Sequence, residues 1–186
     1  MPTPVGHALA GAAVAIVAER SVRSALRWRS LLIVCMALAV LPDLDLLYQP
    51  IHRSFTHSLG SAILVMIVAT VVTGKVTRRS GVILGLVCAA AWGSHIVLDW
   101  LGTDPNPPRG IQALWPFSNR WFISDWDLFL GTERRQLLTG DSIGQNLRAI
   151  VREVLVLAPL VIVLMFARLS HRWGFGGAAR RLGEER

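Results

Sequence analysis

Histidine, aspartate and arginine side chains gather in one short polar stretch of this chain, between two strongly apolar segments. Residues 41–58 contain two carboxylates, two imidazoles and one guanidinium, contributed by Asp43, Asp45, His52, His57 and Arg53. Ionisable groups next to apolar segments of this kind are costly to keep and are by default candidates for a functional site. Imidazoles and carboxylates without a thiolate suit divalent transition metals, so the stretch indicates metal chemistry.

Further candidate ligands lie far away along the chain. His95 and Asp99 stand four residues apart, so a helix would place both on one face. With the N-terminal histidine, the candidates are His7, Asp43, Asp45, His52, His57, His95 and Asp99. A catalytic zinc site needs three protein ligands and an open position, so this set suffices for one or two ions. Such cations would also offset the mutual repulsion of the clustered carboxylates.

The local sequence predicts how the central stretch folds. Pro42 disfavours continuation of the incoming helix, so Asp43 and Asp45 are expected on a turn at a helix end. Ser54 is a plausible N-cap, which would place His57 in the first turn of the next helix. The positive end of that helix favours the neutral imidazole that a metal ligand must be.

The chemistry expected of such a centre is hydrolysis. Zinc is the first choice of metal for these ligands and manganese follows closely. A bound divalent ion lowers the pKa of water to about 7 and polarises a phosphoryl or carbonyl oxygen. Arg53 would steady an anionic substrate group. Asp43 and Asp45 need not both bind metal, because one of them is a candidate for the general base.

The composition is that of a membrane protein. Hydrophobic residues make up 53% and charged residues 17% of the 186-residue chain, against roughly 25% charged residues in soluble domains. The sequence predicts an all-α integral membrane bundle with four or five transmembrane helices. The apolar runs are 5–18, which is marginal in length for a span, 31–41, 58–74, 81–101 and 149–167.

The rest of the chain divides around these runs. Residues 1–170 are predicted to form a single membrane-embedded domain, in which 102–148 form a long exoplasmic or interfacial excursion. Residues 171–186 are predicted to be a basic cytoplasmic tail. Pro159 is expected to kink the last helix. Five tryptophans are expected to be interfacial anchors rather than substrate-stacking groups: Trp92, Trp100, Trp115, Trp121 and Trp126.

The basic residues predict the orientation. Arginine and lysine concentrate in residues 20–29, 75–79 and 168–186, which alternating spans place on one side of the membrane. By the positive-inside rule that side is cytoplasmic, so all candidate ligands fall at the opposite, outward-facing end. The net charge of +7 is therefore explained by cytoplasmic loops, and we expect no nucleic-acid partner.

The motifs resemble those of a known family. Pro-Thr-Pro-Val-Gly-His7, Leu-Pro-Asp43-Leu-Asp45, His52-Arg-Ser-Phe-Thr-His57-Ser, Ser-His95-Ile-Val-Leu-Asp99 and Leu-Trp-Pro-Phe117 are similar to the YdjM-like family of inner-membrane metal-dependent hydrolases. The similarity covers roughly residues 1–120. It implies a helical protein of the bacterial inner membrane with hydrolase activity.

The ligand order also resembles the first half of the zinc-dependent phospholipase C and P1 nuclease group. That resemblance implies His7, Asp43 or Asp45, His57, His95 and Asp99 as metal ligands. The sequence departs from the group's later His-x-x-x-His and His-x-x-x-Glu motifs, because its only later histidine is His171 in the basic tail. This departure argues against a three-metal site.

Three functions follow as expectations. The preferred one is hydrolysis of a phosphoester in a membrane lipid or lipid-linked substrate at the exoplasmic face, in the periplasm. The alternative is a non-catalytic membrane regulator or partner-binding protein with a structural metal. A metal transporter is disfavoured, because residues 58–74 and 81–91 carry no charge on the inner half of the membrane. The substrate, the metal and the oligomeric state are not determined by the sequence.

Overall fold

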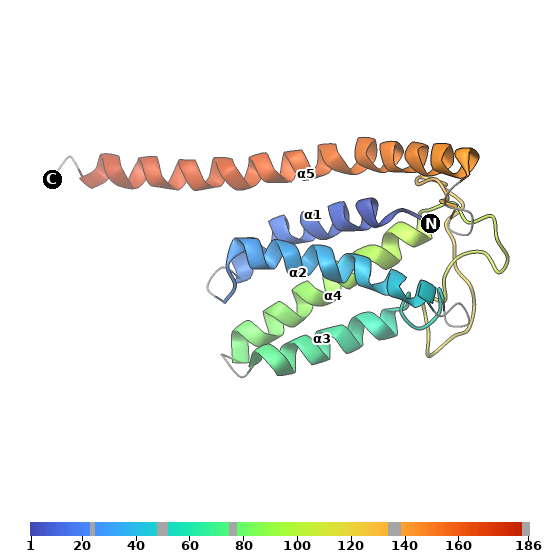
Figure 1. Ribbon diagram of the computed structural model, residues 1–186. Helices are drawn as coiled ribbons and strands as arrows, with labels where there is room; N and C mark the ends of the chain where they lie inside the picture. The colour runs from blue at the N-terminus through green and yellow to red at the C-terminus, as the bar shows by residue number, and fades with distance from the viewer. Residues whose placement is uncertain (23–24, 48–51, 75–77, 134–138, 184–186) are drawn as a thin grey trace.

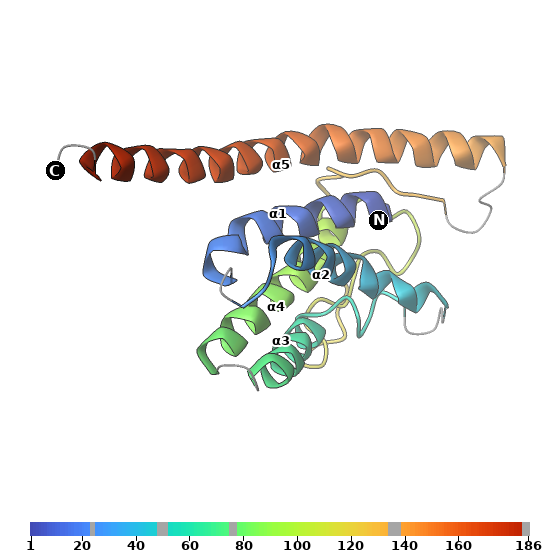
Figure 2. The same ribbon diagram turned by 60° about the vertical axis from the view of Figure 1, so that its left-hand side comes forward.

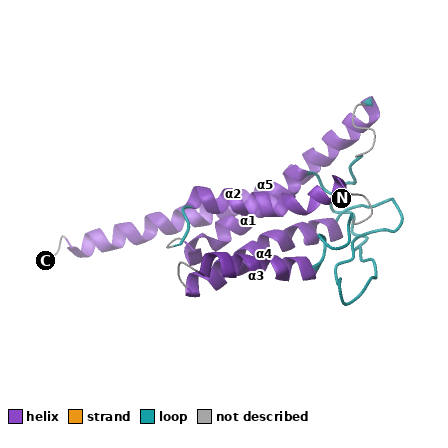
Figure 3. Ribbon diagram, turned by 60° about the horizontal axis from the view of Figure 1, so that its bottom comes forward, coloured by secondary structure: helices purple, strands orange, loops and turns teal. Residues whose placement is uncertain are grey.

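The described residues fold into helices joined by loops, without a strand element. The computed structural model describes residues 1–22, 25–47, 52–74, 78–133 and 139–183, with side chains omitted for 78–80 and 171–183. The elements are α1 (Pro4–Val22), α2 (Trp28–Val40), the 3₁₀ helix η1 (Leu41–Leu47), α3 (Leu59–Gly74), α4 (Arg78–Trp100) and α5 (Gly140–Gly183). Figure 3 shows these helices and the loops between them.

Four helical segments are long and apolar enough to cross a membrane. They are α1, α2 continued through η1, residues 81–100 of α4, and residues 140–170 of α5. The fifth apolar helix, α3, has only 16 residues. The predicted all-α membrane bundle with four or five spans is thus confirmed, and α1, which contains the marginal first run, is among the helices that are long and apolar enough to span.

The helices run back and forth along the bundle, and this order collects the loops at its two ends. The N-terminus, η1 and the loop after α4 lie together at one end, which we call the site end (Figure 1). The last turns of α1 and α3 and the first turns of α2 and α4 lie at the opposite end (Figure 1). The long helix α5 runs along α1 and projects beyond the bundle at the opposite end (Figure 2).

Glycines allow the close helix packing that is typical of membrane bundles. A Cβ atom on Gly11 of α1 would lie 2.5 Å from the backbone oxygen of Cys35 in α2. A Cβ atom on Gly85 of α4 would lie 2.7 Å from the backbone oxygen of Met66 in α3. These contacts bring the backbones together, so that residues on neighbouring helices can meet at a shared site.

The loop after α4 is irregular but anchored in the bundle. Ile111 and Phe129 are buried, and isolated bridges pair Ile111 with Phe122 and Gly102 with Phe129. Helix α5 begins at Gly140, so residues 140–148 of the predicted excursion 102–148 are helical. Residues 134–138 of that excursion lie outside the described residues.

The C-terminal segment belongs to the long helix α5. The backbone of α5 continues as a helix through Pro159 and on to Gly183, so most of the predicted basic tail 171–186 is helical in backbone. Residues 184–186 lie outside the described part of the chain. Proline removes one helical hydrogen bond but does not end this helix.

Candidate metal centre

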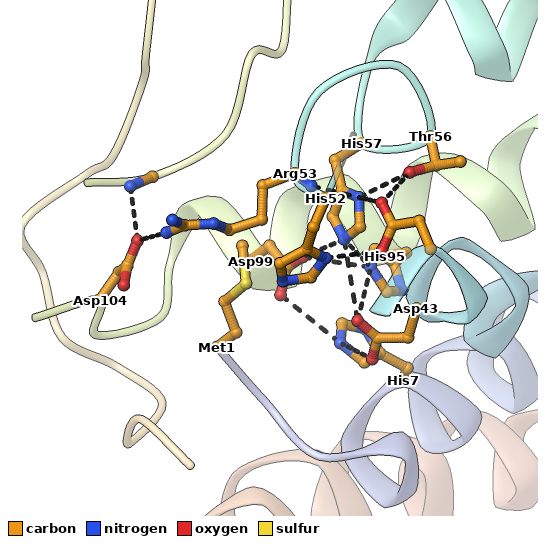
Figure 4. Close-up of polar contacts among 12 residues, drawn as sticks. Met1, His7, Asp43, His52, Arg53, Thr56, His57, His95, Asp99 and Asp104 are labelled. Atoms are coloured by element: carbon orange, nitrogen blue, oxygen red, sulfur yellow. Dashed lines mark hydrogen bonds and ion pairs between the residues drawn. The ribbon is translucent and has the colours of Figure 1, made fainter. Parts of the chain in front are cut away.

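Five of the predicted ligands meet at the site end of the bundle. They come from α1, η1, the loop before α3, and α4, and are His7, Asp43, His57, His95 and Asp99 (Figure 4). We call these five residues the ligand cluster. Their exposed fractions lie between 0% and 8%, so the cluster is almost completely shielded by protein.

The distances within the ligand cluster are those of groups that share one small space. The Nε2 atoms of His57 and His95 each lie 3.1 Å from Oδ2 of Asp99 and 2.9 Å from each other. Nε2 of His7 lies 3.5 Å from Oδ1 of Asp99 and 3.9 Å from Oδ2 of Asp43. The other Asp43 oxygen, Oδ1, lies 3.8 Å from Nε2 of His57 and 3.9 Å from Nε2 of His95. Three imidazole nitrogens and two carboxylates therefore converge on one point.

The 3₁₀ helix explains why two aspartates two residues apart have different surroundings. The predicted turn after Pro42 is in fact η1, which follows α2 directly. With three residues per turn, positions 43 and 45 are two steps of about 120° apart, so their side chains leave the helix axis in directions that differ by about 120°. Asp43 accordingly faces the ligand cluster, whereas Asp45 faces His52, Thr56 and the Nδ1 side of His57.

The start of α3 differs from the prediction. Ser58, not Ser54, caps the helix, because its Oγ accepts a hydrogen bond of 3.1 Å from the backbone N–H of Ser61. His57 therefore stands immediately before α3 rather than in its first turn. The predicted pair on α4 is as expected, since His95 and Asp99 lie one turn apart and contact each other.

Hydrogen bonds at Nδ1 orient two of the cluster imidazoles. Nδ1 of His95 donates to the backbone oxygen of Ala39 at 2.7 Å, because a carbonyl can only accept. Nδ1 of His57 lies 3.2 Å from Oδ2 of Asp45 and 3.0 Å from Oγ1 of Thr56. An N–H on Nδ1 leaves a lone pair on Nε2, which is the arrangement found in metal-bound histidines.

A divalent cation fits this set of donors. Both ring nitrogens of His7 and both oxygens of Asp99 are buried without a hydrogen-bond partner among the described residues. Buried polar atoms are normally paired, and buried carboxylates need a compensating charge. A cation at the point of convergence would supply both the missing partner and the compensating charge. The nitrogen and oxygen donors suit zinc or manganese.

Asp45 and His52, the other two predicted ligands, lie beside the ligand cluster. Oδ1 of Asp45 lies 2.6 Å from Nδ1 of His52, and Oδ2 accepts a hydrogen bond from Thr56. Together with His57 they form a second group whose donor atoms lie within 4.8 Å of one another. Because this group contains the Nδ1 side of His57, Asp45 has the geometry of an outer partner that orients the imidazole.

The charge environment of His57 is strongly acidic. Burial lowers the pKa of its imidazole, but hydrogen bonds to Asp43, Asp45 and Asp99 raise it, and the net pKa is well above 6.5. Without a metal, His57 is therefore the group at which a proton is held near neutral pH.

Arg53 does not enter the ligand cluster. Its guanidinium forms an ion pair with Asp104 and lies over the ring of Trp121, at 5.5 Å from the ring centroid. Next to it is a cavity of about 460 Å³. Its polar lining consists of His52, Arg53, Asp104, Asn106, Thr132, Glu133 and Gln145. The sequence did not single out Asp104, which is buried and also accepts a hydrogen bond from the backbone N–H of Gly110 at 2.8 Å.

The tryptophan prediction was wrong for Trp92. This residue is 7% exposed, and its indole N–H lies 2.9 Å from both the backbone oxygen of Thr56 and Oγ of Ser61. It therefore supports the segment that carries His57 instead of anchoring the protein at the membrane surface. Trp126, in the loop after α4, is by contrast 74% exposed.

A second residue that the sequence interpretation missed is Glu153 of α5. Its side chain is fully buried and accepts hydrogen bonds from the backbone N–H groups of Thr3 and Gly6 at the start of α1. The available signal was an acid that, together with Arg152, interrupts an apolar segment, because such an acid generally has a buried partner.

Comparisons with known proteins agree with this architecture. The family model described as YdjM inner membrane protein matches residues 1–174. The chain is similar to the inner membrane protein YbcI of Escherichia coli strain K12, with 32% identity over 138 residues that cover 69% of this chain and 75% of the relative. No solved structure matches. With its apolar helices, this is a multi-pass inner-membrane protein, and the chain belongs to the YdjM inner membrane protein family.

Proposed function

We propose that this protein is a membrane-bound metal-dependent hydrolase that acts on a phosphoester of a lipid or lipid-linked substrate at the periplasmic face. The observation that carries the proposal is the convergence of three imidazole Nε2 atoms and two carboxylates at one end of a membrane bundle. His7, Asp43, His57, His95 and Asp99 would hold the ion, zinc first and manganese second. A second ion would have to use Asp45 and His52. The bound ion supplies activation of water and polarisation of the phosphoryl oxygen.

Asp45 and His52 have the arrangement of an orienting acid and a proton-transfer group. Nδ1 of His52 lies 2.6 Å from Asp45, and the side chain is 12% exposed where it lines the cavity. The contact with Asp45 holds the proton on Nδ1, so that Nε2 is the atom that accepts or returns a proton. The sequence suggested Asp43 or Asp45 as the base, and the geometry supports His52 in that role with Asp45 behind it.

The cavity beside the ligand cluster suits a polar headgroup. Its volume of about 460 Å³ is within the usual range for small-molecule sites. Arg53 at its wall has five N–H donors, so the ion pair with Asp104 leaves donors for a phosphate. The amide groups of Asn106 and Gln145 and the hydroxyl of Thr132 are suited to uncharged polar groups of the substrate.

The proposed periplasmic orientation is supported by the distribution of basic residues. Arg20, Arg27 and Arg29 lie around the α1–α2 junction, at the opposite end from the ligand cluster. Basic loops remain in the cytoplasm, which directs the site end outward. A lipid headgroup of the outer leaflet would then meet the cavity without leaving the membrane.

One observation favours a second candidate, a membrane regulator or partner-binding protein with a structural metal. The ligand cluster offers five donor groups and is almost fully buried, as is typical of closed structural sites. A catalytic site needs a position that substrate or water can reach. Measured turnover of a substrate would distinguish the hydrolase from the protein with a structural metal.

The deciding experiment combines metal analysis with a hydrolysis screen. Purified protein in nanodiscs is loaded with Zn²⁺ or Mn²⁺ and tested on a panel of phospholipids and on bis-p-nitrophenyl phosphate. We expect bound metal and turnover in the wild type, and loss of both in His57→Ala and Asp99→Ala. His171→Ala, in the basic tail, is the control and should keep both. Bound metal without turnover on any substrate would instead support the structural role.

A further inference from the structure

We propose that Glu153 is a positioning residue that holds His7 in the ligand cluster. The inference rests on the proposed metal site but not on the proposed hydrolysis. Glu153 belongs to α5, which contributes no side chain to the ligand cluster. The link between α5 and the site is therefore indirect and runs through α1.

The carboxylate of Glu153 is anchored to the first turn of α1. It accepts hydrogen bonds from the backbone N–H of Thr3 at 2.6 Å, from the backbone N–H of Gly6 at 2.9 Å and from the hydroxyl of Thr3. Thr3 Oγ1 in turn accepts a bond of 3.1 Å from the N–H of Val5. The first N–H groups of a helix have no partner within the helix and carry partial positive charge, so a carboxylate from another helix satisfies them well.

His7 follows directly on this anchored turn. Its backbone N–H donates to the oxygen of Thr3 at 3.2 Å, so the position of Thr3 fixes the position of His7. The backbone N–H of Gly6 donates to the carboxylate of Glu153, and His7 is the next residue in the sequence. The contact with Glu153 is therefore only one residue away from the ligand.

His7 needs such an anchor because its ring has no hydrogen bond of its own. His95, His57 and His52 are each held at Nδ1 by an oxygen atom. Both nitrogens of His7 lack a hydrogen-bond partner among the described residues, and the ring is stacked on that of His95 at 3.7 Å between centroids. A fixed backbone therefore takes the place of the Nδ1 hydrogen bond that orients the other imidazoles.

Gly6 shows how closely the carboxylate fits. A Cβ atom at this position would lie 2.7 Å from Oε2 and 2.9 Å from Cδ of Glu153. Gly6→Ala would thus displace the carboxylate without changing any charge. It provides a second variant, independent of replacing Glu153 itself.

The opposite end of the same two helices offers a matched control. Glu19 of α1 forms an ion pair with Arg168 of α5, whose guanidinium lies 3.7 Å from the ring centroid of Trp28. This contact also joins α1 to α5 through a buried glutamate, but it lies far from His7 along α1. Glu19→Gln therefore weakens the helix pair without acting on the first turn.

The test uses Co²⁺ as a spectroscopic probe in the purified full chain. The variants are His7→Ala, Glu153→Ala, Glu153→Gln, Gly6→Ala and Glu19→Gln. We expect Glu153→Ala and Gly6→Ala to lower the Co²⁺ affinity about 10- to 100-fold, the usual effect of removing an outer partner. Both should give the visible Co²⁺ spectrum of His7→Ala. Glu153→Gln keeps one acceptor oxygen and should lie between them and the wild type.

Two further comparisons make the result decisive. Adding Glu153→Ala to His7→Ala should cause no further loss of affinity, because both changes remove the same ligand. Glu19→Gln should leave the spectrum and the affinity unchanged. A folded Glu153→Ala or Gly6→Ala protein with wild-type affinity and spectrum would overturn the proposal, as would additive losses in the double variant. If the wild type binds Co²⁺ but hydrolyses no substrate, only the proposed hydrolase activity is refuted. If the wild type binds no Co²⁺, the proposed metal site and the role of Glu153 are both refuted.

Discussion

His57 and His95 point their Nε2 atoms at each other across 2.9 Å. On the other side of each ring, Nδ1 of His95 donates to the backbone oxygen of Ala39 and Nδ1 of His57 lies against Asp45. Two nitrogen lone pairs at this separation repel each other unless a proton or a cation lies between them. At this pair a proton would therefore compete with the proposed metal ion.

This competition predicts the pH dependence of metal binding. The pKa of His57 in the metal-free protein is well above 6.5, because three aspartates outweigh the effect of burial. At neutral pH a metal ion must displace this proton, so metal affinity should rise with pH between about pH 6 and 8. Titration calorimetry in two buffers of different ionisation enthalpy should detect the released proton. Affinity that does not change over this range would contradict the prediction.

The same proton has the opposite effect on the stability of the metal-free protein. A pKa that is raised by folding contributes stability below the unfolded value of about 6.5, and this contribution is lost as the pH rises through the folded value. The melting temperature of the metal-free protein should therefore fall as the pH increases above neutrality. With metal bound this decrease should be absent, because the ion replaces the proton.

Asp43 and Asp45 should differ in what their removal does to the metal. Asp43 faces the Nε2 atoms of the ligand cluster, so Asp43→Asn should abolish stoichiometric binding. Asp45 contacts His52 and the Nδ1 side of His57, so Asp45→Asn should keep the stoichiometry but lower the affinity about 10- to 100-fold. Competition with a chelator measures both effects. The reverse result would exchange the two assignments.

Arg53 should affect the substrate and not the metal. Its φ is +66°, a conformation that costs glycine nothing, so Arg53→Gly removes the side chain without straining the backbone. Loss of a charge-assisted contact should reduce kcat/KM about 10- to 100-fold, mainly through KM, with unchanged metal content. Arg120→Ala, an exposed arginine of the loop after α4, is the control. Equal losses in the two variants would indicate a general effect of positive charge.

The orientation can be tested with single cysteines. Asn119 is an exposed residue of the loop after α4, and Ala25 is an exposed residue between α1 and α2. In intact cells a membrane-impermeant maleimide should label Asn119→Cys, whereas Ala25→Cys should react only after lysis. The wild type, whose Cys35 and Cys88 lie within α2 and α4, gives the background. Labelling of Ala25→Cys alone would reverse the proposed orientation.

The sequence was sufficient for the helices and for the meeting of the ligands. Apolar runs predict spans because an unpaired backbone is costly in lipid, and alternating spans place distant loops at one end. His95 and Asp99 share a helix face through simple periodicity, and the structure shows them one turn apart. These features depend on the chain's own pattern and need no knowledge of tertiary contacts.

Roles that depend on contacts between helices could not be predicted. The different directions of Asp43 and Asp45 follow from the 3₁₀ geometry of η1, which the apolar pattern does not distinguish from a turn. Ser58 rather than Ser54 caps α3 because of the path of the preceding loop, which places His57 immediately before the cap. Glu153 is paired with groups nearly 150 positions away in sequence, at Thr3 and Gly6, so only the packing of α5 on α1 identifies its partners.

The shortness of α3 has a consequence for how substrate arrives. Its 16 residues extend about 24 Å at 1.5 Å per residue, against a hydrocarbon layer of about 30 Å. A bilayer that matches this helix must become thinner beside it. His57 stands just before the first residue of α3, so thinning at this end of the helix would lower the lipid surface next to the ligand cluster. For the proposed lipid substrate, headgroup phosphates would then lie closer to the site without the lipid leaving its leaflet.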